Sequence, residues 1–211
     1  MAIIDEETKK QIKKMFNELD SKVTLTYYNK ETKVAPHIKN MLTELSELSE
    51  KIELKQEEYT DDAKKQGIDD APSIKITSEH IKGNIVYFGI PSGYEFGAFL
   101  QGIIIASKGK TELNSETKKF LSGLKDKLLL EVFVTPTCPH CPVSAYLSYS
   151  LAIESEKVTA HVYEASEFQE ISQKYKISGV PHTEINKGKG NYIGGYPEKE
   201  AIEKIKEVLN N

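Results

Sequence analysis

The 211-residue chain contains no arginine and no tryptophan, and all 28 of its basic residues are lysines. Arginine is the usual side chain that holds a phosphate or carboxylate with two parallel hydrogen bonds, so its absence argues against a dedicated nucleotide or phosphate site. Acidic residues number 32, which gives a net charge of −4 and a pI near 5.8. Nucleic-acid-binding proteins usually carry a basic excess, so we expect no nucleic-acid partner.

Cysteine and long apolar runs are also scarce. Cys138 and Cys141 are the only cysteines, which excludes the disulfide-stapled scaffold of a small secreted protein. The longest apolar stretch, 96–106, is interrupted by glycine and glutamine and is shorter than the ~20 residues that a membrane helix needs. Residues 1–7 have neither the basic nor the apolar part of a signal peptide. We therefore expect a cytoplasmic protein with no membrane partner.

The chain does contain a weak internal repeat. Landmarks recur in order at offsets of 106 to 109: Glu-Thr-Lys-Lys at 7–10 and 116–119, an X-Pro pair at 71–72 and 180–181, and a Tyr-x-Gly segment leading to Pro91 and Pro197. Between the landmarks, apolar strands alternate with helices, expected at 23–28, 38–48, 52–54, 73–76 and 94–106, and again at 129–134, 145–153, 158–163, 182–185 and 198–209. The repeat predicts an α/β fold of two similar units, residues 1–110 and 111–211.

The two cysteines form a Cys-x-x-Cys motif within Thr135–Pro142, where an apolar strand gives way to a helix. This position places the Cys138 sulfur at the amino end of the helix, where free backbone N–H groups and the helix dipole favour a negative charge. A thiolate is the attacking species in thiol–disulfide exchange. We therefore predict that Cys138 is the nucleophile, and that the more buried Cys141, one turn further on, resolves the mixed disulfide.

Neighbouring residues are expected to tune and complete this site. Pro139 favours the first helical turn, and His140, which adjoins both cysteines in sequence, is expected to help lower the pKa of the Cys138 thiol. A cis proline at Val180–Pro181 would present the Val180 backbone to an extended substrate. Two interpretations of His182 stay open: a polar residue that begins a strand, and a group that contacts substrate or moves a proton.

A Cys-x-x-Cys motif has other interpretations. Zinc normally takes four ligands, and no second Cys-x-x-Cys or His pair completes such a set, so we predict no metal site. A structural disulfide across one helical turn would constrain little of the unfolded chain. A docking module is a further alternative, in which the first unit binds a peroxiredoxin or a reductase through the strip Gly89–Tyr94. Glu44, Glu47 and Glu50 are interpreted as a solvated helix face, and Asp61–Asp62 and Asp69–Asp70 as helix-cap and turn residues.

The stretch Phe133–Pro142, together with Gly179–Pro181 and Gly195–Lys199, closely resembles the protein disulfide oxidoreductases of thermophilic archaea and bacteria. Tyr87–Pro91, followed by the segment 93–96, resembles the corresponding part of that family's first unit. The resemblance covers nearly the whole chain. It extends, more distantly, to the amino-terminal module of flavoprotein alkyl-hydroperoxide reductases, in which only the second unit carries a Cys-x-x-Cys.

The resemblance implies two tandem thioredoxin-like folds, each a central mixed sheet flanked by helices, and a thiol:disulfide oxidoreductase acting on protein disulfides and dithiols. Its cofactor would be its own Cys138–Cys141 disulfide, and its partners a thioredoxin-reductase-like flavoprotein and a peroxiredoxin. The chain departs from the family in its first unit, where counting from the strand places Glu31 and Val34 at the positions of the other Cys-x-x-Cys. We therefore expect a redox-inactive first unit.

The position of Cys138 leads to a direct prediction about its acidity. The pKa of its thiol should be lower than that of an ordinary cysteine, between the pKa of thioredoxin and that of strongly oxidising relatives, because the helix terminus stabilises the thiolate. The rate of alkylation by iodoacetamide, measured against pH in the reduced protein, reports this pKa. An inflection at the pH of free cysteine would contradict the assignment.

Overall fold

The computed structural model describes residues 3–210 and contains the same order of elements twice. The first half comprises α1 (Glu6–Phe16), β1 (Val23–Asn29), α2 (Ala35–Glu47), β2 (Ile52–Glu58), α3 (Asp61–Lys65), β3 (Ser73–Thr77), β4 (Asn84–Phe88) and α4 (Tyr94–Lys108). The second half comprises α5 (Ser115–Ser122), β5 (Leu128–Val134), α6 (Cys141–Glu154), β6 (Val158–Glu164), α7 (Gln169–Lys174), β7 (His182–Ile185), β8 (Gly190–Ile193) and α8 (Glu198–Asn210). The duplicated α/β pattern expected from the sequence is therefore present.

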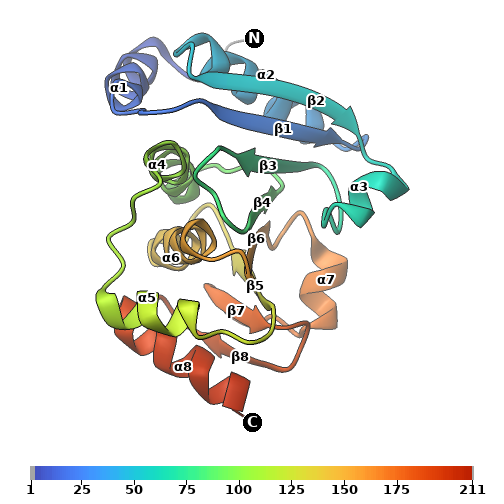
Figure 1. The fold of residues 1–211 in the computed structure, drawn as a ribbon. Helices are drawn as coiled ribbons and strands as arrows, with labels where there is room; N and C mark the ends of the chain where they lie inside the picture. Colours follow the sequence, from blue (N-terminus) through green and yellow to red (C-terminus); the bar gives the residue numbers. More distant parts are fainter. Residues whose placement is uncertain (1–2, 211) are drawn as a thin grey trace.

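All eight strands form one sheet, in the order β2-β1-β3-β4-β6-β5-β7-β8 (Figure 1). The two halves meet where β4 pairs with β6 in parallel, from Asn84 opposite Thr159 to Phe88 opposite Tyr163. Each half contains one strand, β3 or β7, that runs antiparallel to both of its neighbours, as expected for a mixed sheet. As a result β1, β4, β6 and β5 all run in the same direction, and the loops that follow them leave the sheet at the same edge.

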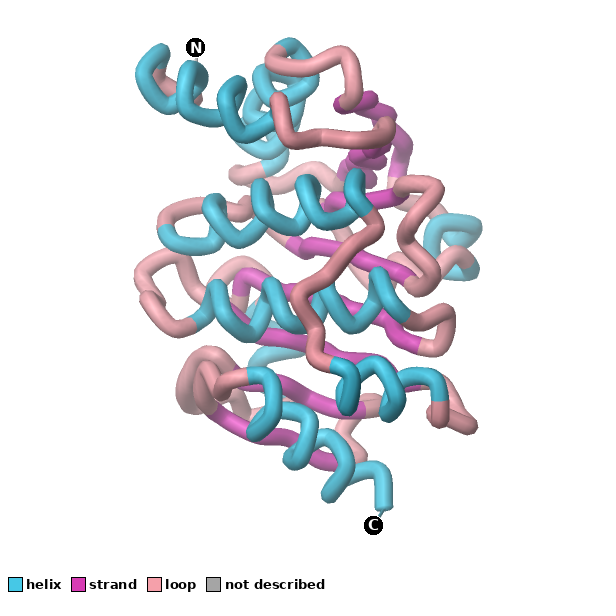
Figure 2. Tube along the Cα trace, turned by 60° about the vertical axis from the view of Figure 1, so that its left-hand side comes forward, coloured by secondary structure: helices cyan, strands magenta, loops and turns pink. Residues whose placement is uncertain are grey.

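The two faces of the sheet are covered unequally. Six helices pack their apolar stripes on one face, and Figure 2 shows several of them as a column in front of the strands. On the opposite face, the short helices α3 and α7 cover a smaller cluster built around Phe88, Phe133 and Tyr163. The helices α4 and α6 lie side by side at the centre, where Gly102 faces the Tyr149 ring so closely that a Cβ would lie 2.8 Å from it. Among residues 3–210, no helix is both long and apolar enough to cross a membrane.

The repeat extends to backbone detail. The Ala71–Pro72 and Val180–Pro181 peptide bonds are both cis. In the first half Gly89 donates its N–H to the Pro72 carbonyl oxygen at 2.9 Å, and in the second half Gly194 donates to the Pro181 carbonyl oxygen at 2.8 Å. The X-Pro and Tyr-x-Gly landmarks of the sequence are therefore paired at the open end of one hairpin in each half, β3–β4 and β7–β8.

The structure corrects which first-half residues correspond to the cysteines. The helix α2 begins at Ala35 and α6 begins at Cys141, and a proline follows each start, so Ala35 corresponds to Cys141 and Thr32 to Cys138. The assignment of Glu31 and Val34 was wrong because it used an offset of 107, whereas β1 and β5 are offset by 105 residues and α2 and α6 by 106. Thr32 Oγ1 accepts a hydrogen bond from Ala35 N–H at 3.2 Å, as the Cys138 sulfur does from Cys141 N–H.

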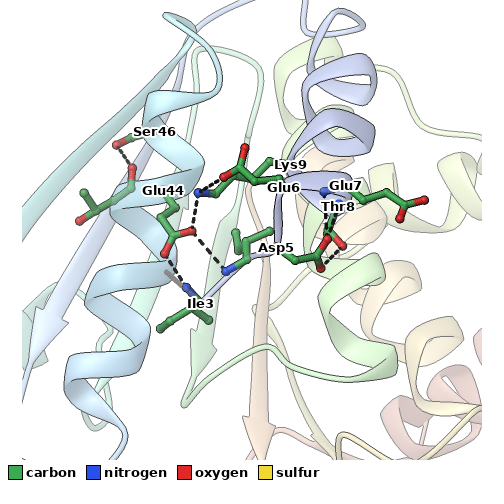
Figure 3. A network of polar contacts seen from close by, with 10 residues as sticks. Ile3, Asp5, Glu6, Glu7, Thr8, Lys9, Glu44 and Ser46 are labelled. Carbon is green, nitrogen blue, oxygen red and sulfur yellow. Dashed lines mark hydrogen bonds and ion pairs between the residues drawn. The ribbon is translucent and has the colours of Figure 1, made fainter. Parts of the chain in front are cut away.

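Three smaller expectations also change. The strand predicted at 52–54 continues to Glu58, because parallel pairing with β1 holds its polar end in the sheet. Pro139 precedes α6, and Pro142 takes the first-turn position expected for Pro139. Glu44 belongs to no solvated face: its carboxylate accepts from the N–H groups of Ile3 and Ile4 and pairs with Lys9, which fixes the amino-terminal segment to α2 (Figure 3).

The junction of the halves leads to a stability prediction. A Cβ at Gly83, directly before β4, would lie 2.1 Å from the Val158 carbonyl oxygen and 2.8 Å from the Ala152 one. Gly83→Ala should therefore destabilise the protein by about 1–3 kcal/mol or more, the usual range for overpacking, as measured by urea unfolding. The matched control is Gly97→Ala in α4, where a Cβ would meet nothing within 4 Å. The control should be neutral or stabilising by up to ~1 kcal/mol, and equal losses in both variants would contradict the prediction.

Candidate active site

The two cysteines lie between β5 and α6 and form a disulfide. Cys138 sits just before the helix and is 8% exposed, whereas Cys141 is its first residue and is fully buried. The backbone N–H of Cys141 points at the Cys138 sulfur at 3.1 Å. This N–H is one of the free donors at the start of a helix, so it would stabilise a thiolate on Cys138 after reduction. Only the outer sulfur is placed for attack by a partner.

The cis-proline segment closes the site on the β7 side. The Val180 carbonyl oxygen lies 3.7 Å from the Cys138 sulfur. Gly195 packs against the loop that carries the motif, since a Cβ there would lie 2.6 Å from the His140 carbonyl oxygen. The structure thus brings together Cys138, Cys141, Val180 and Pro181, four residues singled out from the sequence.

The two histidines near the motif are placed differently. His140 is exposed and precedes α6, and its ring forms no hydrogen bond with the described part of the chain. His182 begins β7 and is buried, and its Nε2 lies 2.9 Å from Glu184 Oε1. Its ring packs edge-on to Phe133, on the sheet face opposite α6. His182 therefore serves as the polar start of a strand, the first of its two interpretations, and the role of His140 stays a prediction.

A carboxyl group that sequence reasoning missed lies at the start of α4. Glu95 is completely buried, and both its oxygens lack a hydrogen-bond partner among the described residues. Burial raises its pKa from 4.5 to about 8. An unpaired buried polar group costs roughly 1–3 kcal/mol, and such groups concentrate at functional sites. The sequence signal was available: Glu95 is the one acidic residue in a largely apolar helix.

Glu95 comes from the first half but faces the second. Its neighbours Gly93 and Tyr94 contact Pro136 in the loop before Cys138, where Tyr94 N–H donates to the Pro136 carbonyl oxygen at 3.0 Å. The helices α4 and α6 thus begin at the same end of the molecule, and Glu95 lies close enough to Tyr149 of α6 to affect its hydroxyl. Burial raises the pKa of the Tyr149 hydroxyl, and the nearby Glu95 carboxyl adds to the effect.

Three exposed apolar side chains surround the disulfide. Tyr94 is 57% exposed, Val143 in the first turn of α6 is 47% exposed, and Ile193 at the end of β8 is 47% exposed. Ile193 is 3.7 Å from a Cβ position at Gly179, beside the cis-proline segment. Among the described residues, no three His, Cys, Asp or Glu side chains are arranged to hold a metal ion.

Comparison with known proteins agrees with this geometry. A family model described as thioredoxin domain matches residues 128–207, which hold the disulfide and the cis proline. A thioredoxin of Methanocaldococcus jannaschii is 35% identical over 85 residues, which cover 39% of this chain and 98% of that protein. The chain belongs to the thioredoxin family. It is a thioredoxin-like oxidoreductase with a Cys-x-x-Cys disulfide.

Solved structures extend the likeness of this thioredoxin-family protein to both halves. A subunit of the alkylhydroperoxide reductase of Enterococcus faecalis (AhpF) superposes with a TM-score of 0.85 at 27% identity, covering 96% of this chain and 99% of that chain. A protein disulfide oxidoreductase from Aeropyrum pernix superposes with a TM-score of 0.86 at 21% identity, covering 99% and 96%. The second likeness concerns the fold alone. The expected pair of tandem thioredoxin-like folds is confirmed.

The raised pKa of Glu95 predicts a pH-dependent stability. Because the folded protein keeps this proton up to a pH of about 8, its contribution to stability is complete below pH ~4.5 and is lost as pH rises toward 8, by at most ~1.4 kcal/mol per pH unit. Glu95→Gln keeps the shape of the neutral acid but cannot ionise. Urea unfolding of the oxidised protein at pH 5, 6 and 7 should therefore show a flatter profile in this variant. Parallel profiles would rule out a buried, titrating Glu95.

Proposed function

We propose that this protein is a thiol:disulfide oxidoreductase that exchanges dithiols and disulfides with protein substrates through Cys138 and Cys141. The redox-active half would be residues 111–211, with residues 1–110 as a redox-inactive half, and the disulfide itself would be the cofactor. The observation that carries the proposal is the asymmetry of the two sulfurs. Cys138 is reachable and faces a helix N–H at 3.1 Å, while Cys141 is fully buried behind it.

The reduction of a substrate would proceed in two exchanges. The Cys138 thiolate attacks one sulfur of the substrate disulfide, which breaks that bond and releases the other substrate sulfur as a thiolate that takes up a proton. Cys141 then loses its proton and attacks the Cys138 sulfur, which breaks the mixed disulfide and releases the second substrate thiol. Two electrons have passed to the substrate, and the Cys138–Cys141 disulfide remains. In the oxidising direction the same steps run in reverse.

The second exchange needs a base for a thiol that water cannot reach. Glu95 is suited to that task, because its carboxyl is buried without a partner among the described residues, on the helix that packs against α6, and its pKa of about 8 lies close to that of a thiol. Glu95→Gln would then slow the resolving step, and the effect would grow as pH rises and the wild-type carboxyl ionises. An unchanged pH profile of disulfide reduction in this variant would remove Glu95 from the mechanism.

Substrate polypeptides would bind over the disulfide. The Val180 backbone next to the cis proline offers strand-like hydrogen bonds, and Tyr94, Val143 and Ile193 offer apolar contacts around it. Tyr94 belongs to the first half, so both halves would contribute to recognition. His140, exposed beside Cys138, would help to set the pKa of the nucleophile.

A narrower function is supported by one comparison. The Enterococcus faecalis chain, at 27% identity over 96% of this chain, belongs to an alkylhydroperoxide reductase. The alternative proposal is therefore a dedicated electron-transfer module, reduced by a thioredoxin-reductase-like flavoprotein and oxidised by a peroxiredoxin. The cysteine chemistry would be the same in both cases, and the breadth of accepted substrates would differ.

The proposed function predicts that the wild-type protein accelerates the reduction of insulin by dithiothreitol, measured as turbidity. Cys138→Ser should abolish this activity, because the buried Cys141 cannot reach a protein substrate. Cys141→Ser should instead accumulate a mixed disulfide with the substrate, visible as a mass adduct that dithiothreitol removes.

The controls separate the two candidates. A wild-type protein that leaves insulin reduction unchanged, yet exchanges rapidly with a peroxiredoxin disulfide, would favour the dedicated module. If Cys138→Ser retains full activity toward both, the assignment of the nucleophile fails. The fold of each variant is checked by its urea unfolding curve.

A further inference from the structure

A groove of about 920 Å³ lies between the two halves, and neither cysteine lines it. One wall is the loop between β1 and α2, with Thr32 and Val34, and the floor is the cis Ala71–Pro72 segment. The opposite wall comes from the second half, where Phe168 and the helix α7 line it. The groove therefore needs both halves, like the active site itself.

The groove is the first-half counterpart of the disulfide site. Thr32 stands where the second half has Cys138, and its hydroxyl accepts the Ala35 N–H at 3.2 Å, as the Cys138 sulfur faces the Cys141 N–H at 3.1 Å. Pro72 stands where the second half has Pro181. The arrangement that presents an extended polypeptide to a nucleophile is thus kept, with a hydroxyl in place of the thiol. A threonine hydroxyl cannot exchange disulfides, so anything bound here is held without a covalent bond.

The lining favours an uncharged segment of polypeptide. Val34, Pro72, Phe168 and Ile171 supply apolar surface. Three lysines line the groove with four acidic residues, one of which is the half-buried Glu167. Burial raises the pKa of Glu167 to about 7, so it is only partly charged at neutral pH. With near-balanced charge, recognition rests on apolar contacts and backbone hydrogen bonds.

One side chain distinguishes the groove from the disulfide site. Asp70 Oδ1 accepts the Ala71 N–H at 2.8 Å and also pairs with Lys30 at 2.8 Å. The position before Val180 is Gly179, which has no side chain to cover the corresponding N–H. The Asp70 and Lys30 side chains are 40% and 50% exposed, and an exposed ion pair of this kind contributes little stability. Asp70 is therefore a cap that an incoming carbonyl oxygen can displace.

The groove and the disulfide open at the same edge of the sheet. The strands β1 and β5 run in the same direction and are four strand positions apart, which is ~20 Å at about 5 Å per strand. About six extended residues span that distance. A single extended polypeptide can therefore reach both the groove and the disulfide.

We propose that this groove binds an extended, apolar segment of the same substrate polypeptide whose disulfide reacts at Cys138, with Asp70 as a displaceable cap over the Ala71 N–H. The proposal rests on the proposed function for the identity of the occupant. It assigns the redox-inactive half a role in holding substrate, and it predicts that removing a groove side chain can strengthen binding.

Disulfide tethering tests the groove without enzyme activity. Thr32→Cys is introduced into a chain carrying Cys138→Ser and Cys141→Ser, so that a single thiol remains. This thiol attacks one of two reagents: a ten-residue apolar peptide activated as a mixed disulfide with a small thiol, or bis(2-hydroxyethyl) disulfide. The rate constant for the peptide is divided by the rate constant for the small disulfide, so that differences in thiol reactivity between positions cancel. The matched control is Asn40→Cys in the same background, at an exposed position of α2 outside the groove.

The ratio is expected to be at least ten-fold higher at position 32 than at position 40. Asp70→Ala should raise it severalfold further, because the Ala71 N–H becomes free, and Val34→Glu should reduce it toward the control value. Equal ratios at positions 32 and 40 would overturn the proposal. A lower ratio in Asp70→Ala than in the parent chain would also overturn the proposal. The Asp70→Ala result keeps the test decisive if Val34→Glu does not fold.

A measurement with the active chain tests whether the occupant is the substrate. Val34→Glu, with both cysteines intact, should lower kcat/KM for insulin severalfold relative to kcat/KM for bis(2-hydroxyethyl) disulfide, which is too small to reach the groove. An unchanged ratio would contradict the proposal that the groove and the disulfide bind the same substrate, even if tethering succeeds. If the wild-type chain reduces neither disulfide, the proposed function fails, while the tethering result still decides whether the groove binds peptide.

Discussion

The parallel pairing of β4 with β6 is the interaction on which the rest of the structure depends. It joins two similar halves into one sheet of eight strands, and it sets the central helices α4 and α6 side by side on the same face. This contact brings Gly93 and Tyr94 of the first half to Pro136, in the loop that precedes Cys138. The redox site of the second half is therefore assembled with parts of the first, although the first half has no cysteine.

The active site combines an accessible sulfur with a buried one, and each environment has a separate physical cause. Cys138 precedes the helix and faces a free N–H, which stabilises negative charge. Cys141 lies within the core, where burial disfavours the charged thiolate. Its thiol therefore needs a nearby base that accepts its proton. A carboxyl group with a pKa near 8 is a suitable base in such surroundings, since it is neutral in the resting protein and able to accept a proton once ionised.

Much of this could be predicted from the sequence, because the signals were local or repeated. The Cys-x-x-Cys at a strand–helix junction predicts the position of the disulfide, which the structure contains, and the recurring X-Pro pairs predict the duplicated fold. Position-specific features were harder. The equivalence of Thr32 with Cys138 depends on a one-residue difference in loop length, which a constant offset cannot reveal. The partial burial of Glu44 and the full burial of Glu95 depend on segments far away in sequence, the amino terminus and the second half respectively.

The single sheet also has a consequence for how the chain avoids self-association. Two separate halves would present four open strand edges, and two of these would be β4 and β6, whose residues are almost entirely buried. Fusion leaves β2 and β8 as the outer strands. The edge strand β2 ends in exposed, mostly charged residues, and β8 is only four residues long, both common features of edges that resist aggregation. Retaining a half without cysteines thus protects the strand beside the redox site from pairing with another molecule.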